Sequence, residues 1–329
     1  MSLGQLVPPE ADAPPHPAAS AAREVRIAVL VPCKDEEAAI GRVVTDFMAH
    51  LPSATVYVYD NNSVDRTREA ARAAGAVVRA EPLQGKGNVV RRMFSDVEAD
   101  VYVLVDGDDT YDASSAPSMV DKLLEEQLDM VNGARQAQGE AAYRPGHRLG
   151  NAVLTGMVAL IFGDRFQDLL SGYRVFSRRY VKSFPALSTG FEIETELTVH
   201  ALELKMPVAE ISTSYKDRPA GSASKLKTYR DGWRILRTIV NLMKGERPLL
   251  FFFIAFLVLM LISLVLVYPV IVTYRNTGLV PRFPTAILST GIMIVGFLCL
   301  FAGLILDMVT HGRREIKRLR YLEIAAPRR

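Results

Sequence analysis

Two long apolar runs near the end of the sequence constrain its fold most strongly. Residues 248–274 contain no charged side chain, and residues 283–309 contain only Asp307. Each run exceeds the roughly 20 residues that a helix needs to cross a lipid bilayer. Two buried core helices are the alternative, but a core helix rarely stays apolar on every face over such a length. The sequence therefore predicts two transmembrane helices.

Basic residues beside these runs predict their orientation. Seven Lys and Arg lie between positions 225 and 247, and five lie between positions 313 and 320. The loop between the runs carries only Arg275 and Arg282. Because Lys and Arg accumulate in cytoplasmic loops, the large amino-terminal part and the tail are both expected in the cytoplasm, joined by a short hairpin outside. The clustered basic residues are expected to meet anionic lipid.

Composition excludes other classes of protein. The net charge of +3 is too small to indicate a nucleic-acid partner. The two cysteines, Cys33 and Cys299, cannot provide a disulfide framework or a cysteine-based metal site. Residues 1–24 are Pro/Ala-rich without an apolar core, so we expect a disordered segment rather than a signal peptide.

The next part of the chain alternates between β-branched runs and helical patterns. Strands are expected at Ile27–Val31, Thr55–Tyr59, Val77–Arg79, Val101–Val105 and Met130–Asn132. Helices are expected at Glu36–His50, Asp65–Ala74, Gly87–Val97 and Ser114–Gln127. This alternation predicts an α/β domain with a mainly parallel sheet covered on both faces. Ligands of such sheets bind at the carboxyl ends of the strands.

Three further helices are expected beyond this alternation, at Leu149–Phe162, Glu192–Leu204 and Lys225–Lys244. The last has apolar residues spaced three and four apart and a basic opposite face. An ordinary core-facing helix is the alternative. Because a transmembrane run follows directly, we favour a helix that lies at the membrane interface.

The acidic run Asp106-Gly107-Asp108-Asp109 directly follows the apolar residues 101–105. Carboxylates two residues apart on a turn can converge on one divalent cation, which can then hold the phosphates of a nucleotide. The alternative is a polar turn that caps the helix near Ser114. The first interpretation predicts a metal-diphosphate site.

Three other polar loops are expected at strand ends. In Pro32–Glu37 the acids could instead serve only the dipole of the following helix. In Asp60–Thr67 an Asp at a strand end can accept hydrogen bonds from a base or ribose, although helix capping is a rival explanation. In Gln84–Asn88 two glycines allow a close backbone approach, and Lys86 offers a charge for phosphate. P-loop and dinucleotide fingerprints are missing, so ATP hydrolysis by a P-loop and hydride transfer lose their usual support.

Together with Ser171–Arg174, these loops resemble the ordered signature of family 2 glycosyltransferases. Within that family the chain most resembles the polyprenyl-phosphate glycosyltransferases, which include dolichyl-phosphate mannose synthase and the bacterial undecaprenyl-phosphate glucosyl and aminoarabinosyl transferases. The resemblance covers roughly residues 25–309. It implies a Rossmann-like GT-A domain for nucleotide-diphosphate sugars, followed by the interfacial helix and the two transmembrane helices.

The resemblance also implies a division of the chain and a place in the cell. The expected parts are a disordered segment (1–24), a GT-A domain (25–215), a juxtamembrane segment with the amphipathic helix (216–247), a transmembrane hairpin (248–310) and a basic cytoplasmic tail (311–329). The protein would be a multi-pass protein of the inner membrane that serves cell-envelope glycan or glycolipid modification. The oligomeric state is left open, although some bacterial relatives form tetramers.

Roles for the donor side follow from the matched motifs. Pro32, Asp35, Glu37 and Asp60 would line the nucleoside pocket of a UDP- or GDP-linked donor, and Lys86 would border it. Asp106 and Asp108 would bind Mg²⁺ or Mn²⁺, which bridges the diphosphate. Two positions depart from the family pattern: Thr110 stands where several relatives have a metal-binding Gln, and Asn61 and Asn62 replace a common Asp-Gly pair.

Roles for the acceptor side follow in the same way. Arg174 would lie near the transferred sugar and the acceptor phosphate, and Asp168 is the nearest candidate for a catalytic carboxylate beside Asp108. Asp168 could equally be a structural partner of Arg174. Arg218, Ser224 and Lys225 resemble the family segment that would meet the lipid phosphate.

The implied reaction transfers one sugar to a polyprenyl phosphate. That acceptor is already anionic, so its oxygen needs little help from a base, and direct displacement would invert the anomeric carbon. A processive polysaccharide synthase, a transferase with a ceramide or protein acceptor, and a catalytically silent scaffold that binds nucleotide sugars remain alternatives.

Overall fold

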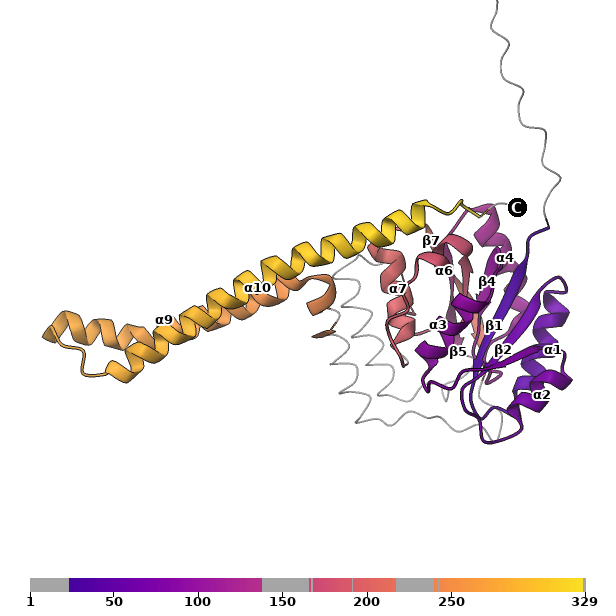
Figure 1. The fold of residues 1–329 in the computed structure, drawn as a ribbon, viewed down its shortest axis with the longest axis horizontal. Coiled ribbons are helices and arrows are strands. Elements are labelled where there is room, and N and C mark those ends of the chain that lie inside the picture. Colours follow the sequence, from indigo (N-terminus) through magenta and orange to yellow (C-terminus); the bar gives the residue numbers. More distant parts are fainter. Residues whose placement is uncertain are drawn as a thin grey trace, which may run out of the picture.

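The computed structural model describes residues 24–137, 166, 168–190, 192–216, 240–241 and 243–327. They form a seven-stranded sheet with helices on both faces and a long helical hairpin that projects from it (Figure 1). The strands are β1 (Ile27–Cys33), β2 (Thr55–Asp60), β3 (Val77–Ala80), β4 (Val101–Leu104), β5 (Met130–Ala137), β6 (Arg174–Ser177) and β7 (Val208–Tyr215). The helices are α1 (Ile40–His50), α2 (Thr67–Ala73), α3 (Lys86–Asp96), η1 (Ala113–Ser115), α4 (Ala116–Glu125), α6 (Arg178–Ser183), α7 (Ile193–Glu203), α9 (Pro248–Thr277) and α10 (Phe283–Leu322).

The sheet has the order β3-β2-β1-β4-β6-β5-β7. Strands β1 to β4 pair in parallel, β6 runs antiparallel to both β4 and β5, and β7 pairs in parallel with β5. The mainly parallel sheet predicted from the sequence is therefore confirmed, and β6 is its antiparallel member. The register sets Cys33 beside Asp60, so the ends of β1 and β2 lie together.

Alternate strand residues face two hydrophobic cores. Val29 and Val31 of β1 pack on one face with α1 and α4, whereas Leu30 packs on the other face with α3, α6 and α7. All three side chains are fully buried. This double-sided burial explains why the parallel strands are apolar throughout rather than alternating.

Most expected elements are present, with ends shifted by a few residues. Helix α1 begins at Ile40 rather than at Glu36, and β5 continues to Ala137 rather than ending at Asn132. Helix α7 closely matches the expected Glu192–Leu204. The sequence analysis did not predict β6, α6 or β7. The expected helix at 149–162 and most of that at 225–244 lie outside the described residues, as do residues 1–23.

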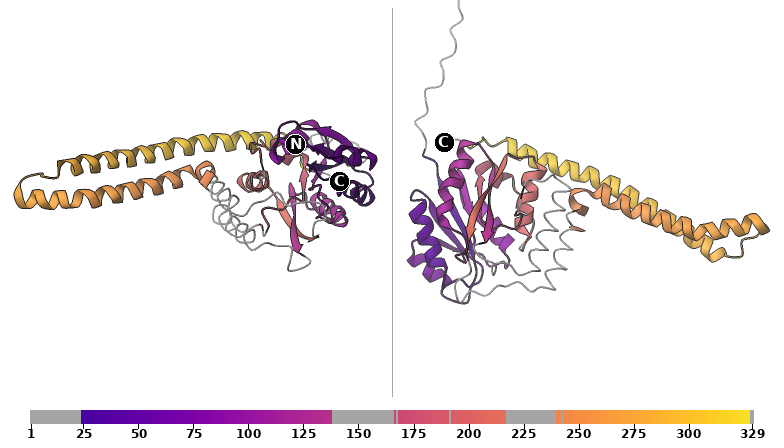
Figure 2. Two further views of the ribbon diagram at one scale, coloured as in Figure 1. Left: turned by 90° about the horizontal axis from the view of Figure 1, so that it is seen from below. Right: turned by 180° about the vertical axis from the view of Figure 1, so that it is seen from behind.

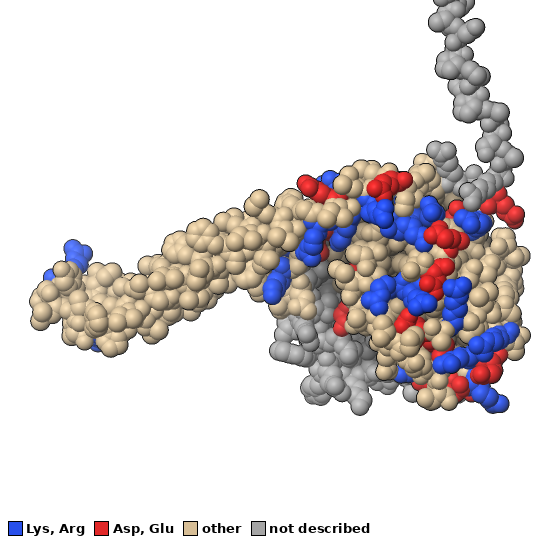
Figure 3. All heavy atoms as spheres, viewed as in Figure 1, with Lys and Arg blue, Asp and Glu red and all other residues tan. Residues whose placement is uncertain are grey.

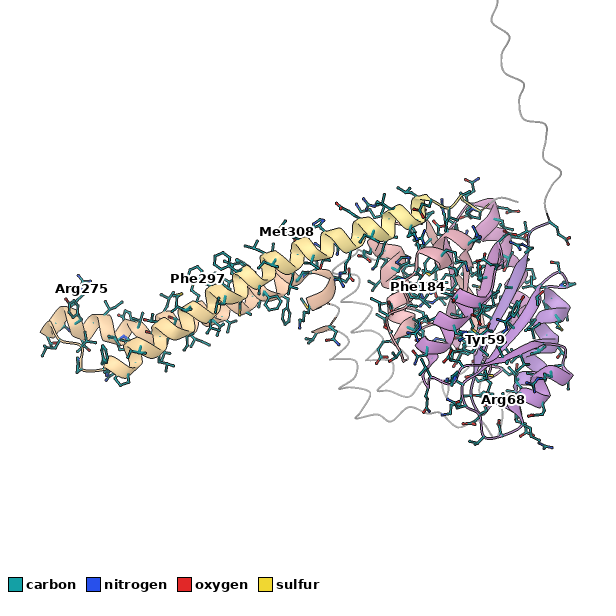
Figure 4. All side chains as sticks on the ribbon, in the orientation of Figure 1. Tyr59, Arg68, Phe184, Arg275, Phe297 and Met308 are labelled. Atoms are coloured by element: carbon teal, nitrogen blue, oxygen red, sulfur yellow. The ribbon has the colours of Figure 1, made fainter. Side chains whose placement is uncertain are left out.

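Helices α9 and α10 run side by side in both views of Figure 2. Ser263 donates a hydrogen bond to the carbonyl of Ser289 at 2.8 Å, and the rings of Phe256 and Phe297 lie 5.3 Å apart. Only 11% of the most apolar window of each helix is buried, which is the opposite of a core helix. Figure 3 shows tan surface between the hairpin tip and the domain, and Arg275 lies at that tip (Figure 4). Both helices are therefore candidate membrane spans, as predicted.

Helix α10 continues past its apolar part to Leu322 and returns to the α/β domain (Figure 1). Residues 311–322, expected to be part of a basic tail, form the last turns of this helix. They contact α6 and α7 through side-chain interactions that are described below.

Candidate active site

Lys86 and Asp106 meet at the carboxyl edge of the parallel strands. Asp106 follows β4, and Lys86 begins α3. The Lys86 Nζ lies 2.5 Å from Asp106 Oδ1 and 2.6 Å from Glu194 Oε1 of α7. The Lys86 side chain is only 10% exposed, whereas that of Asp106 is 30% exposed. The site is thus a buried lysine held between two carboxylates, one of which reaches the surface.

Lys86 and the two carboxylates beside it shift the pKa values of Lys86 and Glu194. Burial by itself lowers the pKa of Lys86, but Asp106 and Glu194 outweigh burial and hold that pKa well above its ordinary value. For Glu194, burial is the largest effect and the charge of Asp106 adds to it, so its pKa is raised despite Lys86. Lys86 therefore stays charged beside Asp106 at neutral pH.

The sequence analysis did not single out Glu194. It lies in the first turn of α7, and its Oε2 atom is buried without a hydrogen-bond partner among the described residues. The available signal was an acid at the start of a predicted helix. Neighbouring Glu192 and Glu196 share that signal, so the sequence could not show which one faces Lys86.

Asp108 lies in the turn after Asp106 and is buried. Its Oδ1 accepts hydrogen bonds from the Thr110 hydroxyl at 2.6 Å and from the Thr110 backbone N–H at 3.3 Å. Thr110, which replaces the metal-binding Gln of several relatives, thus orients the neighbouring carboxylate. Helix capping near Ser114 is performed by Asp112 instead.

The paired aspartates offer a donor set that suits a divalent cation. Among the described residues, no group of three or more His, Cys, Asp and Glu lies close enough to enclose a metal. Mg²⁺ is commonly bound through only one or two carboxylates, with phosphate and water completing its coordination. Two carboxylates, one partly exposed, fit that pattern, and Mg²⁺ or Mn²⁺ would be held by Asp106 and Asp108.

Gly172 packs against this carboxylate edge. A Cβ atom at position 172 would collide with the carboxylate of Asp106, so any larger residue would have to displace that carboxylate. The Gly172 backbone N–H donates to the Tyr111 hydroxyl at 2.8 Å. The Ser171 hydroxyl donates to the carbonyl of Gly133, which fixes the motif to β5. The segment 171–174 is thereby held directly beside the candidate site.

The loop before α3 is shaped by a neighbouring segment. Cβ atoms at Gly85 or Gly87 would collide with the backbone carbonyls of Thr189 and Ser188. Glu196 holds that segment in turn, because its carboxylate accepts from the backbone N–H groups of residues 187 and 188 at 2.8 and 2.7 Å. These glycines therefore permit a close approach of protein backbone, which places Lys86 against Glu194.

Asn61 connects the ends of β2 and β3 to the same loop. Its side-chain amide donates to the carbonyls of Glu81 at 3.0 Å and Leu83 at 2.8 Å. Its oxygen accepts from the Gly85 N–H at 2.7 Å. An aspartate here could make only the last bond. The departure from the family's Asp thus has a structural reason.

Asp60 is fully buried at the end of β2. Its carboxylate lies 2.6 Å from Arg68 Nε and accepts weaker bonds from the Ser63 N–H at 3.3 Å. The Arg68 side chain is 38% exposed. The structure therefore places Asp60 beneath an arginine at the edge where the resemblance implies a nucleoside pocket.

Hydrogen bonds join the loop of residues 32–37, at the end of β1, to the loop of residues 60–67, at the end of β2. Asp35 accepts from the Val64 N–H at 2.9 Å, and Glu37 accepts from Arg66 Nε at 2.9 Å. Because α1 begins only at Ile40 and has no acid in its first turn, Glu37 does not serve the dipole of that helix. Pro32 lies within β1. The structure thus brings Asp35 and Glu37 against the loop that follows Asp60.

Asp168 is paired with Arg135. Its two carboxylate oxygens accept from Arg135 Nε at 2.7 Å and Nη2 at 2.8 Å. Burial raises the pKa of Asp168, but the bonds and charge of Arg135 outweigh burial and lower it overall. Among the described residues, Asp168 forms its ion pair with Arg135 rather than with Arg174.

Arg174 is fully buried at the start of β6. Its guanidinium donates to the carbonyls of Leu169 at 2.7 Å and Ser171 at 3.0 Å, and to the Thr198 hydroxyl at 2.8 Å. In this structure Arg174 holds the 169–172 segment in place through hydrogen bonds to its backbone carbonyls. Arg218, Ser224 and Lys225 lie outside the described residues.

Comparison with known proteins identifies the family. The model described as "Glycosyl transferase family 2" matches residues 28–184. Glycosyltransferase AglJ of Haloferax volcanii is 32% identical over 308 residues, which cover 90% of this chain and 98% of that protein. Dolichyl-phosphate hexose transferase of the same organism is 29% identical over 222 residues, which cover 67% of this chain and 95% of that protein. The chain belongs to glycosyl transferase family 2.

Solved structures agree with this assignment at the level of the fold. Glucosyl-3-phosphoglycerate synthase from Mycobacterium tuberculosis, in complex with phosphoglyceric acid, matches with a TM-score of 0.56 and 21% identity over 67% of this chain and 80% of that chain. The same enzyme in complex with Mn²⁺, UDP and glucosyl-3-phosphoglycerate matches with a TM-score of 0.54. The predicted GT-A-like domain, followed by two candidate membrane spans, is confirmed.

Proposed function

We propose that the protein transfers a single sugar from a nucleotide-diphosphate sugar to a polyprenyl phosphate at the cytoplasmic face of the inner membrane. The product would be a lipid-phosphate-linked sugar for cell-envelope glycan or glycolipid modification. The observation that carries the proposal is the cluster of Lys86, Asp106 and Asp108 at the carboxyl edge of a sheet whose chain continues into two exposed apolar helices.

The donor side of the cluster suits a diphosphate. Asp106 and Asp108 would hold Mg²⁺ or Mn²⁺, which when bound offsets the negative charge of the diphosphate and of the departing nucleotide. Lys86 adds a fixed positive charge next to this position. Asp60, with the loops of Asp35 and Glu37, would border the UDP or GDP base. Family relationship supports this arrangement, since solved neighbours of similar fold were crystallised with UDP and Mn²⁺ or Mg²⁺.

The acceptor side follows from the membrane helices and a relative. One similar protein is named a dolichyl-phosphate hexose transferase, and dolichyl phosphate is a polyprenol-type lipid phosphate. An acceptor anchored in the same bilayer as α9 and α10 has fewer positions to search than a free molecule, which lowers the entropic cost of encounter. Arg218, Ser224 and Lys225 are proposed to meet its phosphate.

The proposed chemistry is a direct displacement. A phosphate oxygen of the acceptor forms a bond to the anomeric carbon while the bond from that carbon to the nucleoside diphosphate breaks. Because the acceptor oxygen is already anionic, no residue has to remove a proton from it. The low pKa of Asp168 keeps this group charged, and we propose that it and Arg174 shape the acceptor edge. A single displacement inverts the anomeric carbon.

The basic flanks support the cytoplasmic orientation. Positive charge precedes α9 and follows the apolar part of α10, whereas the hairpin tip carries only Arg275 and Arg282.

The proposal is tested with membranes that contain the full chain, undecaprenyl phosphate and a panel of radiolabelled UDP- and GDP-sugars. We expect label from one donor in the lipid fraction, lost with a chelator and restored by Mg²⁺ or Mn²⁺. Asp108→Asn should abolish transfer. Asp109→Asn is the matched control, because Asp109 has a φ of 57° that asparagine tolerates and pairs outward with Arg42. Equal loss in both variants, or no transfer from any donor, would contradict the proposal.

A further inference from the structure

The end of α10 is bound to the α/β domain through a buried carboxylate. Glu203, the last residue of α7, has a side chain that is only 2% exposed. It accepts from Arg314 at 3.1 Å and from Lys317 at 2.6 Å. Arg314 also bonds the carbonyl of Glu246 at 2.7 Å, just before α9. A buried carboxylate needs such partners, because an unpaired one is strongly destabilising.

A second contact lies one turn further along α10. Asp129 is fully buried and binds Arg179 through two bonds of 2.5 and 2.8 Å. The Tyr321 hydroxyl donates to the same carboxylate at 2.8 Å, and the Arg179 guanidinium lies 4.6 Å from the centre of the Tyr321 ring. Tyr321 also packs against the core on the α3, α6 and α7 face. Two separate positions of α10 are therefore fixed to the domain.

These contacts change the interpretation of the basic end of the chain. The sequence predicted anionic lipid as the partner of the basic residues after the second apolar run. In the structure, Arg314 and Lys317 are instead engaged by Glu203, whereas Arg318 is exposed. Adjacent basic residues on one helix thus have different surroundings, which offers a matched comparison.

Helix α7 joins this contact to the candidate active site. Glu194 in its first turn bonds Lys86, and Glu203 at its end bonds α10. Its eleven residues span about 16 Å at the usual helical rise. Most of its residues are buried on more than one face, so it is packed as a rigid element. Helix α7 therefore holds the end of α10 at a fixed distance from the edge that carries Lys86 and Asp106.

We propose that Glu203, Arg314, Lys317, Asp129, Arg179 and Tyr321 form a dock that sets the height and orientation of the active-site edge relative to the membrane helices. We call these six residues the α7–α10 dock. They are positioning residues, and they act on capture of the membrane-borne acceptor rather than on capture of the soluble donor. The inference rests on the proposed lipid-phosphate acceptor.

The test compares Lys317→Gln with Arg318→Gln in the full chain, reconstituted in lipid nanodiscs. Each variant removes one positive charge from the same helix, but only the first removes a dock contact. We expect Lys317→Gln to raise KM for undecaprenyl phosphate about fivefold with kcat and the donor KM unchanged. Arg318→Gln should leave all three unchanged. Equal effects of the two variants would indicate attraction to lipid and would overturn the dock.

Two further measurements separate positioning from general damage. Transfer to a short, water-soluble isoprenyl phosphate in detergent should be the same in Lys317→Gln and the unchanged chain, and a parallel loss with both acceptors would overturn the inference. Hydrogen exchange of residues 312–322 should be faster in Lys317→Gln than in Arg318→Gln. Failure of the unchanged chain to use any polyprenyl phosphate would contradict the proposed function instead, and the exchange rates alone would then support the dock or, if equal, overturn it.

Discussion

At the scale of the residue, the amide of Asn61 positions the loop that carries Lys86. Asn61→Asp would remove both bonds to the carbonyls of Glu81 and Leu83 and set a negative charge against them. We expect a loss of about 2 kcal/mol of stability and a higher KM for the donor. Asn62→Asp is the control, since Asn62 makes one exposed bond to the Pro82 carbonyl. Thermal unfolding and donor titration measure both effects, and equal results for the two variants would refute this role.

Gly172 is predicted to be irreplaceable because of its contact with Asp106. Gly172→Ala would place a methyl group against the Asp106 carboxylate and should abolish nucleotide binding while the chain remains folded. Gly41→Ala in α1 meets no atom within 4 Å and should leave binding unchanged. Isothermal titration with nucleotide and circular dichroism check both points. Normal binding by Gly172→Ala would show that Asp106 is free to move.

The low pKa of His200 predicts that the folded protein loses stability in mild acid. Burial, with a smaller effect of Lys317, lowers its pKa from 6.5 to about 3. The unfolded chain therefore binds a proton below pH 6.5 that the folded chain refuses until about pH 3, so stability falls as pH falls through this range. Between pH 7.5 and 5 the loss should be about 2 kcal/mol. His200→Gln should flatten the melting temperature over this range; an unchanged slope would assign the effect to other groups.

The candidate site was only partly predictable from these residues. Asp106, Asp108 and Lys86 stand in local motifs, so their placement at strand ends could be predicted. Glu194 could not, since Glu192, Glu194 and Glu196 all stand at the start of the predicted helix and only tertiary packing selects one of them for Lys86. The bond between Asp168 and Arg135 also joins distant segments that no local spacing relates.

At the scale of the element, predictability followed the strength of local patterns. The buried parallel strands were predicted from their short β-branched apolar runs, and the amphipathic helices from the period of their apolar residues. Strand β6 was missed because its four residues begin with an arginine, whose burial depends on acceptors elsewhere in the chain. Strand β7 was missed because half of the residues in its sequence VAEISTSY are polar and it is only partly buried at the sheet edge.

The pairing of α9 and α10 gives a prediction at the same scale. A Cβ at Gly303 would lie 2.9 Å from Phe252 Cβ and 3.5 Å from the Leu249 backbone. Gly303→Leu should therefore separate the helices and cost about 1–3 kcal/mol. Gly291→Leu, where nothing lies within 4 Å, should be tolerated. Thermal unfolding in detergent distinguishes them, and equal melting temperatures would contradict the observed pairing.

At the scale of the whole molecule, one chain combines a nucleotide-sugar fold with an apolar hairpin and a return contact between them (Figure 1). The sequence predicted the first two parts, because motifs and hydropathy are local. It did not predict the return of α10 to α6 and α7, which depends on a buried Glu203 and a buried Asp129 in distant segments. The arrangement would place the proposed donor site at a fixed position beside the candidate membrane spans.

The most direct test of the central claim is a comparison of acceptors with one donor in reconstituted vesicles. Initial rates of label transfer are measured with undecaprenyl phosphate, with the dephosphorylated alcohol and with ceramide. The proposed function predicts transfer to the lipid phosphate alone, with an inverted anomeric carbon in the product. Transfer to the alcohol or to ceramide at an equal or higher rate, or retention of configuration, would contradict it.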